Sequence, residues 1–498
     1  MRTVLGIDLG TQSLKVVFYD FVQKRQVAVA SAPLTLNQNG AGLAEQEPNA
    51  WTKALILALA AVDQRIRASA TAVAVSGQQH GLVLLDREGV ALRPATLWCD
   101  TTCAPSCDTL HAELGGAGQA IKLAGNPVLP GYTAGKLKQV QVQEPEVYRR
   151  IQHILLPHDY LNYVLTGTMA MEFGDASGTA FFDVRERAWS KPILHALDRE
   201  RDIRVWLPPL IQPFSRLGSI SETAAALTGL PAGIPVATGG GDNMMAAIGT
   251  GNLVPGRATI SLGTSGTLFA YADQPVVDPN GEIAAFCSAT GGWLPLLCTM
   301  NCTLAGEWGR RLFGYDMDRF EALIAEAPAG SEGVITLPFF SGERTPNLPN
   351  AKAWMIGLDG TNGLPRNLLR AAVEGATFAL RFGLDALRRL ELESNQIVLT
   401  GGGSSSATWR QIVADVCNKP VVVLEQDQGA AFGAALQALA LLEGIGAEDF
   451  PALVNAHLSR DEARCHEPNP TAAATYRDIY QTYRRAVEHA RHFSLGDA

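Results

Sequence analysis

A short motif occurs twice in this chain, about half a chain length apart, and this repeat constrains the fold more than any other feature. GIDLGTQS covers residues 6–13, and ISLGTSG covers residues 260–266. Asp8 of the first copy aligns with Ser261 of the second, an offset of 253 residues (261 minus 8) in a chain of 498. In both copies an apolar, strand-like run leads into Leu-Gly-Thr. The repeat predicts two lobes of similar construction.

Each copy of the motif is typical of a strand that ends in an anion-binding turn. Glycine lets the backbone bend tightly, so that N–H groups and a hydroxyl can approach a phosphate. The second copy has no acid at the position of Asp8. Two such turns facing each other across a cleft, with a single carboxylate, suit one nucleoside triphosphate and one magnesium ion. Ordinary glycine-containing turns are the alternative interpretation.

The chain alternates between strand-like and helix-like segments. Short aliphatic runs such as TVLGIDL, TAVAVSG and QIVLTGGG are separated by Ala/Leu-rich stretches such as WTKALILALAAVDQRI and LLRAAVEGATFALRFGLDALRRL. The last stretch, TAAATYRDIYQTYRRAVEHARHF, has the pattern of one long amphipathic helix. This alternation predicts an α/β protein.

Composition excludes several classes of partner. The formal net charge is −9 and the isoelectric point is near 5.6, which argues against nucleic acid or an anionic membrane surface. No window has the roughly 18 apolar residues of a membrane span, and a strand pattern at Val4 leaves no room for a signal peptide, so we expect a cytoplasmic protein. The eight cysteines are scattered without the paired spacing of a zinc site, and we expect them to be buried or incidental thiols.

Two common nucleotide-binding motifs are missing. GYTAGKL lacks the first glycine and the final hydroxyl of a P-loop, and no G-x-G-x-x-G opens a helix after the first strand. The run LTGGGSSSATWRQIVADV instead predicts a strand, three glycines and a helix that begins near Ser405 or Ser406. Bare backbone at the glycines would let a base and ribose lie against it, although a simple strand-to-helix turn is the alternative.

TGGGDN, at residues 238–243, is the strongest candidate for chemistry. Asp242 follows three glycines after a short strand-like run, so its carboxylate is expected at the end of a strand, before a helical NMMAAIG. A helix N-cap would explain an aspartate at this place equally well. The functional interpretation is a general base that accepts a hydroxyl proton as the oxygen attacks a phosphoryl group.

Two further segments supply polar and aromatic side chains that suit a polyol. SGQQHGLVLLD contains Gln79 and His80, and TLWCDTT contains Trp98 and Asp100. An amide, an imidazole and a carboxylate can bind hydroxyls, and an indole can form an apolar wall. A structural histidine is the alternative for His80.

These motifs together resemble the FGGY family of carbohydrate kinases. DLGTQS, TGGGDN, ISLGTSG, SGERTPNLPNAKAWMIGLDGTNGLPRNLLRAAVEG and LTGGGSSS occur in the order found in that family, and LLPHDYLNYVLTG and DASGTAFFDV are also similar. The resemblance implies a two-lobe, actin-like (ribonuclease H-like) ATPase fold with the ligand cleft between the lobes. It also implies ATP, Mg²⁺ and phosphorylation of the terminal hydroxyl of D-xylulose. Kinases of ribulose, gluconate or glycerol, and an actin-like ATPase that acts on a protein partner, are the alternatives.

The resemblance also assigns roles to residues by position. Asp242 matches the catalytic base, Asp8 the acid near magnesium, acting through water, and Asn243 a sugar contact beside the base. Gln79 and His80 match a sugar-binding dipeptide, which Trp98 and Asp100 are expected to complete. The phosphate turns comprise Gly10, Thr11, Gln12 and Ser13 in the first copy and Gly263, Thr264 and Ser265 in the second, and the adenosine loop comprises Gly401, Gly402, Gly403 and Ser405.

The same resemblance predicts the domain organisation. We expect a sugar-binding lobe over residues 1–247, an ATP-binding lobe over 248–445 and a helical extension over 446–498. The expected partner is a small sugar, with no nucleic acid and no membrane. The sequence leaves the oligomeric state open, with a homodimer as one alternative.

Overall fold

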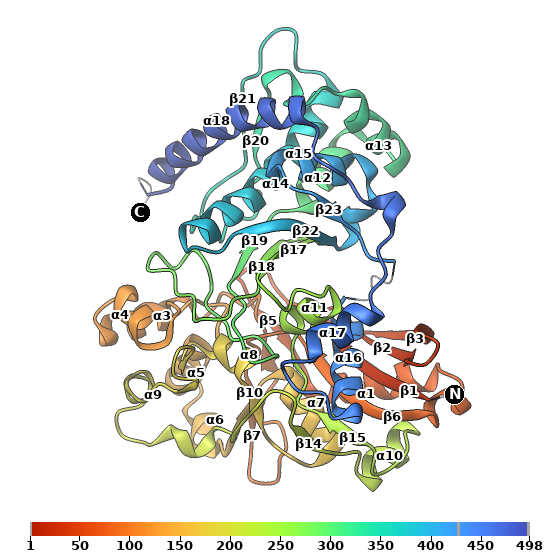
Figure 1. Cartoon of the computed structure of the whole chain (residues 1–498). Helices are drawn as coiled ribbons and strands as arrows, with labels where there is room; N and C mark the ends of the chain where they lie inside the picture. The colour runs from red at the N-terminus through yellow and green to blue at the C-terminus, as the bar shows by residue number, and fades with distance from the viewer. Residues whose placement is uncertain (1, 426–428, 496–498) are drawn as a thin grey trace. The chain divides into compact units, whose positions relative to one another are not determined.

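The computed structural model describes residues 2–425 and 429–495. The chain forms two compact units, each assembled from separate segments (Figure 1). Unit 1 comprises Met1–Leu253, Ala272–Leu294 and Gln428–His457, and unit 2 comprises Val254–Tyr271, Pro295–Asp427 and Leu458–Ala498.

Unit 1 is built on a mixed sheet in the order β14-β15-β6-β1-β2-β3, with β16 also paired to β6. β1 runs parallel to β6 and antiparallel to β2, as expected for a strand that turns back directly on itself. The bounds are β1 Thr3–Leu9, β2 Ser13–Asp20, β3 Arg25–Pro33, β6 Ala70–Gly77, β14 Arg216–Ser219, β15 Pro235–Ala237 and β16 Gly240–Gly241.

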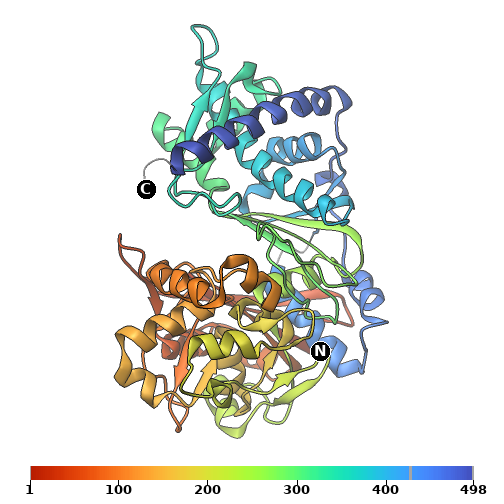
Figure 2. The ribbon, with the colours of Figure 1, turned by 90° about the vertical axis from the view of Figure 1, so that its left-hand side faces the viewer.

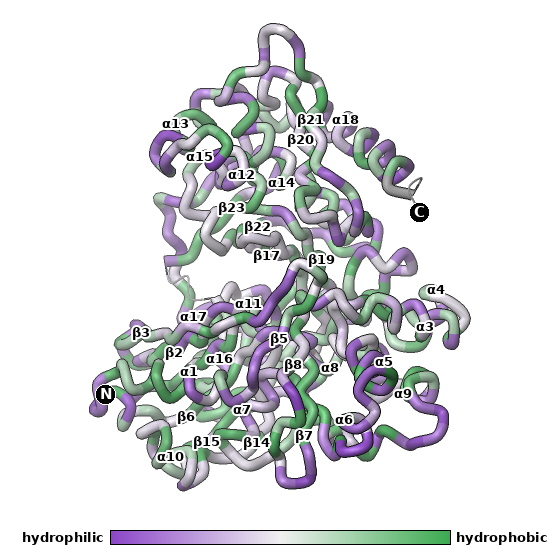
Figure 3. Tube along the Cα trace, turned by 180° about the vertical axis from the view of Figure 1, so that it is seen from behind, coloured by the Kyte–Doolittle hydropathy of each residue, from purple (hydrophilic) through white to green (hydrophobic). Residues whose placement is uncertain are grey.

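Alternate residues of β1 face two different layers. Leu5, Ile7 and Leu9 belong to an apolar core that also contains Trp51 and Leu55 of α1 (Pro48–Ala60). The opposite face contacts α16 (Gly429–Glu443), so that a helix from near the C-terminus lies against N-terminal strands (Figure 1). Figure 3 shows this hydrophobic centre in green and the polar peripheral helices α5 and α6 in purple.

Glycines allow α16 to approach its neighbours closely. A Cβ added to Gly6 of β1 would lie 1.8 Å from the carbonyl oxygen of Ala431. A Cβ on Gly433 would lie 1.8 Å from the carbonyl oxygen of Met245 in α11 (Asp242–Gly249). Backbone therefore packs on backbone along α16, which fixes the start of α11 relative to β1.

The remaining helices of unit 1 surround this centre. They are α2 Gln64–Arg67, α3 Ala104–Leu114, α4 Ala117–Ala124, α5 Thr133–Gln143, α6 Pro145–Arg150, α7 Pro157–Thr166, α8 Phe173–Ala176, α9 Lys191–Leu197, α10 Glu222–Thr228 and α17 Phe450–His457. Short strands join them: β4 Asn37–Gln38, β5 Ala44–Gln46, β7 Val83–Leu85, β8 Ala95–Thr96, β9 His153–Leu155, β10 Met171–Glu172, β11 Phe182–Asp183, β12 Ala188–Trp189 and β13 Leu210–Ile211.

Unit 2 repeats the central arrangement of unit 1. Its sheet has the order β19-β18-β17-β22-β23, in which β17 is antiparallel to β18 and parallel to β22. The pairing of β17 with its two neighbours is thus the pairing of β1 with β2 and β6, as the motif repeat predicts. The bounds are β17 Gly256–Leu262, β18 Gly266–Ala270, β19 Leu296–Thr299, β20 Ile335–Leu337, β21 Trp354–Ile356, β22 Ser394–Thr400 and β23 Val421–Val422.

Five α-helices accompany this sheet in the described part of unit 2. They are α12 Thr303–Phe313, α13 Met317–Glu326, α14 Pro365–Arg389, α15 Ala407–Cys417 and α18 Pro470–Leu495. The long C-terminal helix predicted from the sequence is α18, which contacts α14 and α15 (Figure 2). No helix in the described ranges combines the length and apolar character that crossing a membrane requires.

The α/β class is confirmed. The compact units are assembled from separate segments, and the predicted lobe boundaries stay a prediction beside them. Of residues 248–445, the segment 272–294 and α16 belong to unit 1. Of residues 446–498, α17 lies in unit 1 and α18 in unit 2. The physical reason is the apolar, glycine-containing α16, which covers β1 although some 420 residues of chain separate them.

Candidate functional site

Asp8 lies near the end of β1, beside β2 and β6. Its register neighbours are Lys15 on β2 and Ser76 on β6. Ser76 donates a hydrogen bond from Oγ to Asp8 Oδ1 over 2.8 Å. Burial raises the pKa of Asp8, and the hydrogen bond from Ser76 and the charge of Lys15 oppose this rise. A carboxylate held in this way suits a role near a cation.

The turn after β1 is tied to Trp98 through one hydroxyl. The backbone N–H of Gly10 donates to the carbonyl of Ser13 over 3.0 Å, which closes the turn. Trp98 Nε1 donates to Thr11 Oγ1, and that hydroxyl donates to Gln78 Oε1, each over 3.0 Å. Gln12 is exposed. The predicted phosphate turn and the predicted aromatic wall are therefore neighbours in unit 1.

Asp242 is the first residue of α11 and directly follows the glycine turn. Gly240 and Gly241 form β16, which pairs in parallel with the end of β6. The N-cap position is Gly241. Asp242 Oδ1 accepts hydrogen bonds from the backbone N–H of Asn243, over 2.8 Å, and from its Nδ2, over 2.9 Å. Because both bonds go to Oδ1, Oδ2 is left to accept a further proton.

The environment of Asp242 favours a group that titrates near neutral pH. Burial raises the pKa of Asp242 to about 7, and the charge of Asp8 adds to this rise. The hydrogen bonds from Asn243 oppose it, and the charge of Asp175 contributes further. A carboxylate with a pKa close to the working pH is what general-base catalysis requires.

Two buried side-chain amides form hydrogen bonds with the backbone of the glycine turn. Gln437 of α16 accepts from the N–H of Gly239 over 2.9 Å and donates to its carbonyl over 3.2 Å. Asn162 of α7 donates to the carbonyl of Thr238 over 2.9 Å. Gly239 has φ +73°, and a Cβ there would lie 2.2 Å from the carbonyl oxygen of Val75, so only glycine fits. The position of Asp242 is thus set by side chains that sequence analysis did not single out.

Gln79 and Asn243 are joined directly. Asn243 Nδ2 donates to Gln79 Oε1 over 3.0 Å as well as to Asp242. A Cβ on Gly241 would lie 2.7 Å from Gln79 Cγ, so the glutamine packs on bare backbone. Two residues predicted as sugar contacts are therefore brought together beside the predicted base.

The backbone of His80 has an unusual conformation, and its ring packs against two aromatic side chains. Its φ of +67° lies in the left-handed region, and its carbonyl accepts from Thr133 Oγ1 over 3.1 Å and from Lys136 Nζ over 2.8 Å. The ring stacks on Phe286, with centroids 5.7 Å apart, and meets Tyr132 edge-on at 5.0 Å. The buried Lys136 therefore fixes the loop that carries the predicted sugar-binding dipeptide.

Asp100 is engaged by the chain itself. Its Oδ2 accepts from the N–H of Ala44 over 2.7 Å, and its Oδ1 accepts from the N–H of Thr102 over 2.9 Å and from its hydroxyl over 2.6 Å. The residue is 0 % exposed. This geometry gives Asp100 a role in holding its loop, and a contact with substrate stays a prediction.

The second turn and the predicted adenosine loop are neighbours in unit 2. The carbonyls of Gly263 and Thr264 accept from the N–H groups of Thr303 and Cys302, over 2.9 Å each. Gly401 has φ +82°, and a Cβ there would lie 2.8 Å from the backbone of Leu262. Ser265 lies in the second turn. Gly402, Gly403 and Ser405 belong to the short 3-10 helix η4 (Gly402–Ser405), and Ser406 caps α15.

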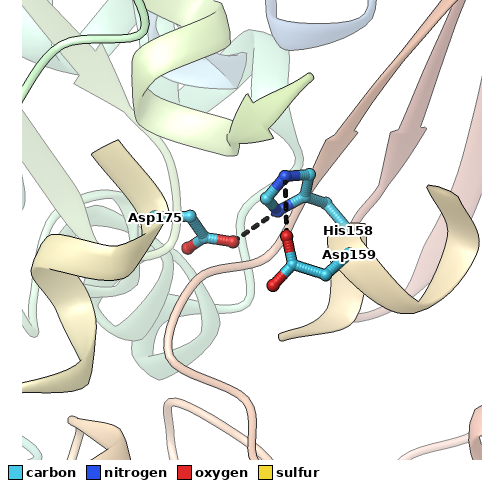
Figure 4. A group of neighbouring side chains, drawn as sticks. All are labelled: His158, Asp159 and Asp175. Carbon is cyan, nitrogen blue, oxygen red and sulfur yellow. Dashed lines mark hydrogen bonds and ion pairs between the residues drawn. The ribbon is translucent and has the colours of Figure 1, made fainter. Parts of the chain in front are cut away.

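A buried cluster of one histidine and two aspartates, which lies next to Gly239 of the glycine turn, was not predicted from the sequence. It contains His158 of α7, Asp159 beside it and Asp175 of α8 (Figure 4). His158 Nδ1 lies 2.5 Å from Asp175 Oδ2, and Nε2 lies 3.2 Å from Asp159 Oδ1. The only available signal was the pair of segments PHDYLNY and DASGT, which supported the resemblance but suggested no role. All eight cysteines are free thiols and none belongs to this cluster.

Two models of one family match most of the sequence. The model of the FGGY family of carbohydrate kinases, N-terminal domain, matches residues 3–249, and that of the C-terminal domain matches residues 258–442. The chain belongs to the FGGY family of carbohydrate kinases. The predicted two-lobe, actin-like ATPase class of fold is thereby confirmed.

Three individual comparisons cover nearly all of the chain. The xylulose kinase of Haemophilus influenzae is 43% identical over 486 residues, which are 96% of this chain and 98% of that protein. The crystal structure of a ligand-bound xylulose kinase from Lactobacillus acidophilus has a TM-score of 0.91 at 25% identity, over 100% of both chains. The crystal structure of a gluconate kinase from the same organism also has a TM-score of 0.91, at 26% identity over 98% of both chains. The fold is thus shared by kinases of different sugars.

Proposed function

We propose that this FGGY kinase transfers the γ-phosphoryl group of ATP to a terminal hydroxyl of D-xylulose, with Asp242 as the general base. The observation that carries the reaction is the Asp242 carboxylate, which stands at the end of a glycine turn with Oδ2 open and with a raised pKa. The choice of sugar is supported by the 43% identity to a xylulose kinase over almost the full length of both chains.

The sugar hydroxyl is activated by proton transfer to Asp242. As the hydroxyl oxygen attacks phosphorus it becomes acidic, and the carboxylate accepts its proton. Asn243 holds Oδ1 through two hydrogen bonds, which directs Oδ2 toward the substrate. A base that is fixed before the substrate arrives needs little reorganisation in the transition state.

The sugar is recognised by polar and aromatic groups of unit 1, of which Gln79 is connected to Asp242 through Asn243. Gln79 Oε1 accepts a hydrogen bond from the side-chain amide of Asn243, and the Gln79 Nε2 group can donate to a sugar hydroxyl. Trp98 supplies an apolar wall next to Thr11, to which it donates a hydrogen bond. His80 reaches this region from a loop that Lys136 and Thr133 hold rigidly.

The phosphates are bound by the two repeated turns, and the nucleoside by the glycines after β22. In unit 1 the groups are the backbone N–H donors and hydroxyls of the turn at residues 10–13. In unit 2 they are those of the turn at residues 263–265, and the adenosine lies on Gly401, Gly402 and Gly403. Backbone donors at glycine turns bind phosphate without a cationic side chain.

Asp8 is the residue that would hold magnesium, through water. Carboxylate oxygens are preferred Mg²⁺ ligands, and Ser76 occupies only Oδ1 of Asp8. The charge of Asp8 also raises the pKa of Asp242, and a divalent cation would relieve this repulsion. The residues present therefore fit the ion, which when bound would offset phosphate charge during transfer. A cytoplasmic location and a homodimer stay predictions.

Release of ADP measured with a coupled assay over a panel of sugars tests the proposal. The panel comprises D-xylulose, ribulose, gluconate and glycerol, and the expected result is the highest kcat/KM with D-xylulose. A preference for gluconate or glycerol would contradict the choice of sugar but keep the kinase reaction. ATP hydrolysis that no sugar stimulates would instead favour an ATPase that acts on a protein partner.

A further inference from the structure

Two buried glutamines, Gln46 and Gln78, hold one residue of the first predicted phosphate turn. Gln46 ends β5 and is 3 % exposed, and Gln78 directly follows β6 and is 1 % exposed. Gln46 Nε2 donates to the carbonyl of Thr11 over 2.6 Å, and Gln78 Oε1 accepts from the hydroxyl of Thr11 over 3.0 Å. Neither glutamine was a candidate in the sequence. The backbone and the side chain of Thr11 are therefore both fixed by residues outside the turn.

The orientation of the Gln46 amide follows from its neighbours. Trp51 Nε1 donates to Gln46 Oε1 over 2.9 Å, and an indole nitrogen can only donate. On the other side of the amide, the carbonyl of Thr11 can only accept. The oxygen of Gln46 must therefore face Trp51, and its NH₂ group must face Thr11. Trp51 belongs to the apolar core of unit 1, which anchors this end of the contact.

The same orientation extends through Gln78 to Trp98. Gln78 Nε2 donates to Gln46 Oε1 over 3.0 Å, which leaves Gln78 Oε1 to accept from Thr11. The Thr11 hydroxyl donates its one proton to Gln78 and accepts from Trp98 Nε1 over 3.0 Å. Each amide oxygen and nitrogen of the two glutamines is therefore hydrogen-bonded, and the bonds form a continuous path from the core to the proposed sugar wall.

These contacts leave the turn with occupied acceptors and open donors. The carbonyl of Thr11 accepts from Gln46, that of Gln12 accepts from the N–H of Leu34 over 2.8 Å, and that of Ser13 closes the turn. In the described part of the chain, the backbone N–H groups of Thr11 and Gln12 have no hydrogen-bond partner. A carbonyl oxygen that pointed toward a phosphate would repel it, whereas free N–H groups attract it. The contacts of the two glutamines thus favour the binding of an anion at this turn.

We propose that Gln46 and Gln78 are positioning residues for phosphoryl transfer, which hold Thr11 so that the turn directs its N–H groups toward the phosphates of ATP. This inference rests on the proposed function, because that function assigns the turn to phosphate. Both glutamines act through Thr11 and need no contact with a ligand. A displacement of about 1 Å at a reacting group can reduce a rate about 10²-fold. Loss of either glutamine should therefore weaken the binding of the phosphates and lower kcat.

Two variants of similar side-chain size remove the glutamine contacts to different degrees. Gln46→Met removes the donor to the Thr11 carbonyl and the acceptor for Trp51 and Gln78. Gln78→Met removes the acceptor for the Thr11 hydroxyl but leaves Gln46 bound to Trp51 and to the Thr11 carbonyl. The effect of Gln46→Met should therefore be the larger one.

Asn126→Leu is the matched control. Asn126 is 1 % exposed, and its amide pairs with the backbone of Ala285, accepting over 2.8 Å and donating over 2.7 Å. This variant also removes a buried amide that binds backbone within unit 1, but the partner of that amide is not in the phosphate turn. A loss of stability alone should therefore appear in Asn126→Leu as well, whereas a loss of phosphate binding should not.

Calorimetry with two probes, at a temperature where each variant is folded, separates the phosphates from the nucleoside. The probes are the ATP analogue AMP-PNP and adenosine, which the proposed function assigns to the glycines of unit 2. We expect Gln46→Met to weaken the binding of AMP-PNP about 3- to 10-fold and that of adenosine less than about twofold. The kcat should fall about 10- to 100-fold, with the KM for D-xylulose changed by less than about threefold. Gln78→Met should show the same pattern with smaller changes, and Asn126→Leu should bind AMP-PNP as the parent does.

Hydrogen exchange of peptides that cover residues 9–14 gives a readout without ligand. These amides should exchange faster in Gln46→Met and at the parental rate in Asn126→Leu. Parental exchange or parental affinity for AMP-PNP in Gln46→Met, an equal loss for adenosine, or an equal loss in Asn126→Leu would each overturn the inference. If Gln46→Met does not fold, the same measurements on Gln78→Met decide it. A parent that phosphorylates no sugar would contradict the proposed function instead, and the exchange rates would still show whether the glutamines hold the turn.

Discussion

The side-chain amide of Asn243 donates a hydrogen bond to Gln79 Oε1 over 3.0 Å and another to Asp242 Oδ1 over 2.9 Å. Asn243 and Asp242 begin α11, whereas Gln79 follows β6, more than 160 residues earlier. One asparagine thus connects the proposed base to a proposed sugar contact, and the parallel pairing of β16 with β6 brings the two segments together.

Gln79→Met should weaken sugar binding more than it lowers kcat. Gln79 Nε2 is buried and has no hydrogen-bond partner among the described residues, so a sugar oxygen would satisfy it. Loss of one such bond costs about 0.5–1.5 kcal/mol, equivalent to roughly 2- to 12-fold in affinity. Steady-state kinetics should show this increase in the KM for D-xylulose and an unchanged KM for ATP. An equal change in both KM values would contradict a direct sugar contact.

Gly433→Ala should destabilise unit 1 strongly. The added Cβ would lie 1.8 Å from the carbonyl oxygen of Met245, a backbone atom that cannot move without shifting α11. Overpacking of this kind typically costs about 1–3 kcal/mol, and a clash with backbone lies at or above the upper end. Thermal unfolding followed by circular dichroism measures the loss. Gly446→Ala is the control, because nothing lies within 4 Å of its Cβ, and it should unfold at the parental temperature.

The sequence predicts local features of this fold well. The strand–turn–strand units around Asp8 and Ser261 recur in the structure with the same pairing, because each depends on a short apolar run and one glycine. The helix after TGGG begins at Asp242, and α15 begins at Ala407 with Ser406 as its cap, as the local pattern indicates.

Features that depend on distant segments were not predictable from local pattern. Membership of α16 in unit 1 depends on contacts between Ala431 and Gly6, and no periodicity in either segment reveals them. His158 and Asp175 come from separate helices, so their contact is set by how α7 and α8 pack. Residue type alone suggested that Asp100 binds sugar, which stays a prediction, whereas its hydrogen bonds with Ala44 and Thr102 depend on how the loop folds.

Asp100→Asn should lower stability while it leaves catalysis largely unchanged. Asparagine replaces one accepting oxygen by an NH₂ group, which would face the N–H of Ala44 or the N–H of Thr102 and leave that buried donor unpaired. An unpaired buried group costs about 1–3 kcal/mol. The melting temperature should fall, and kcat should stay within about threefold of the parental value at a temperature where the variant is folded. A large increase in the KM for sugar with normal stability would instead support direct contact with substrate.

Asp242→Asn should abolish most of the phosphoryl transfer. Asparagine has nearly the same shape and can keep an oxygen toward Asn243, but it cannot accept the substrate proton. General-base catalysis contributes typically about 10²–10⁴-fold, so kcat should fall by at least about 10²-fold with both ligands still bound. Binding measured by calorimetry and turnover measured by ADP release separate the two effects. Asp8→Asn is the comparison: its loss of activity should be reversed in part by excess Mg²⁺, whereas that of Asp242→Asn should not.

The raised pKa of Asp242 predicts opposite effects of pH on activity and on stability. The base must be ionised to accept a proton, so kcat/KM for the sugar should fall tenfold per pH unit below about pH 7. For stability, the folded-state pKa of about 7 lies above the ordinary value of 3.8, so the folded protein holds this proton more tightly than the unfolded chain does. As pH rises from 3.8 to 7, this group therefore favours unfolding increasingly, and above pH 7 the whole penalty is present. Asp242→Asn removes the penalty, so the variant should melt at a higher temperature than the parent at pH 8, and the difference should shrink toward pH 5. Melting curves recorded at the two pH values, without ligands or Mg²⁺, test this. A variant that melts below the parent at pH 8 would show that charged Asp242 stabilises the fold, which contradicts the expected penalty.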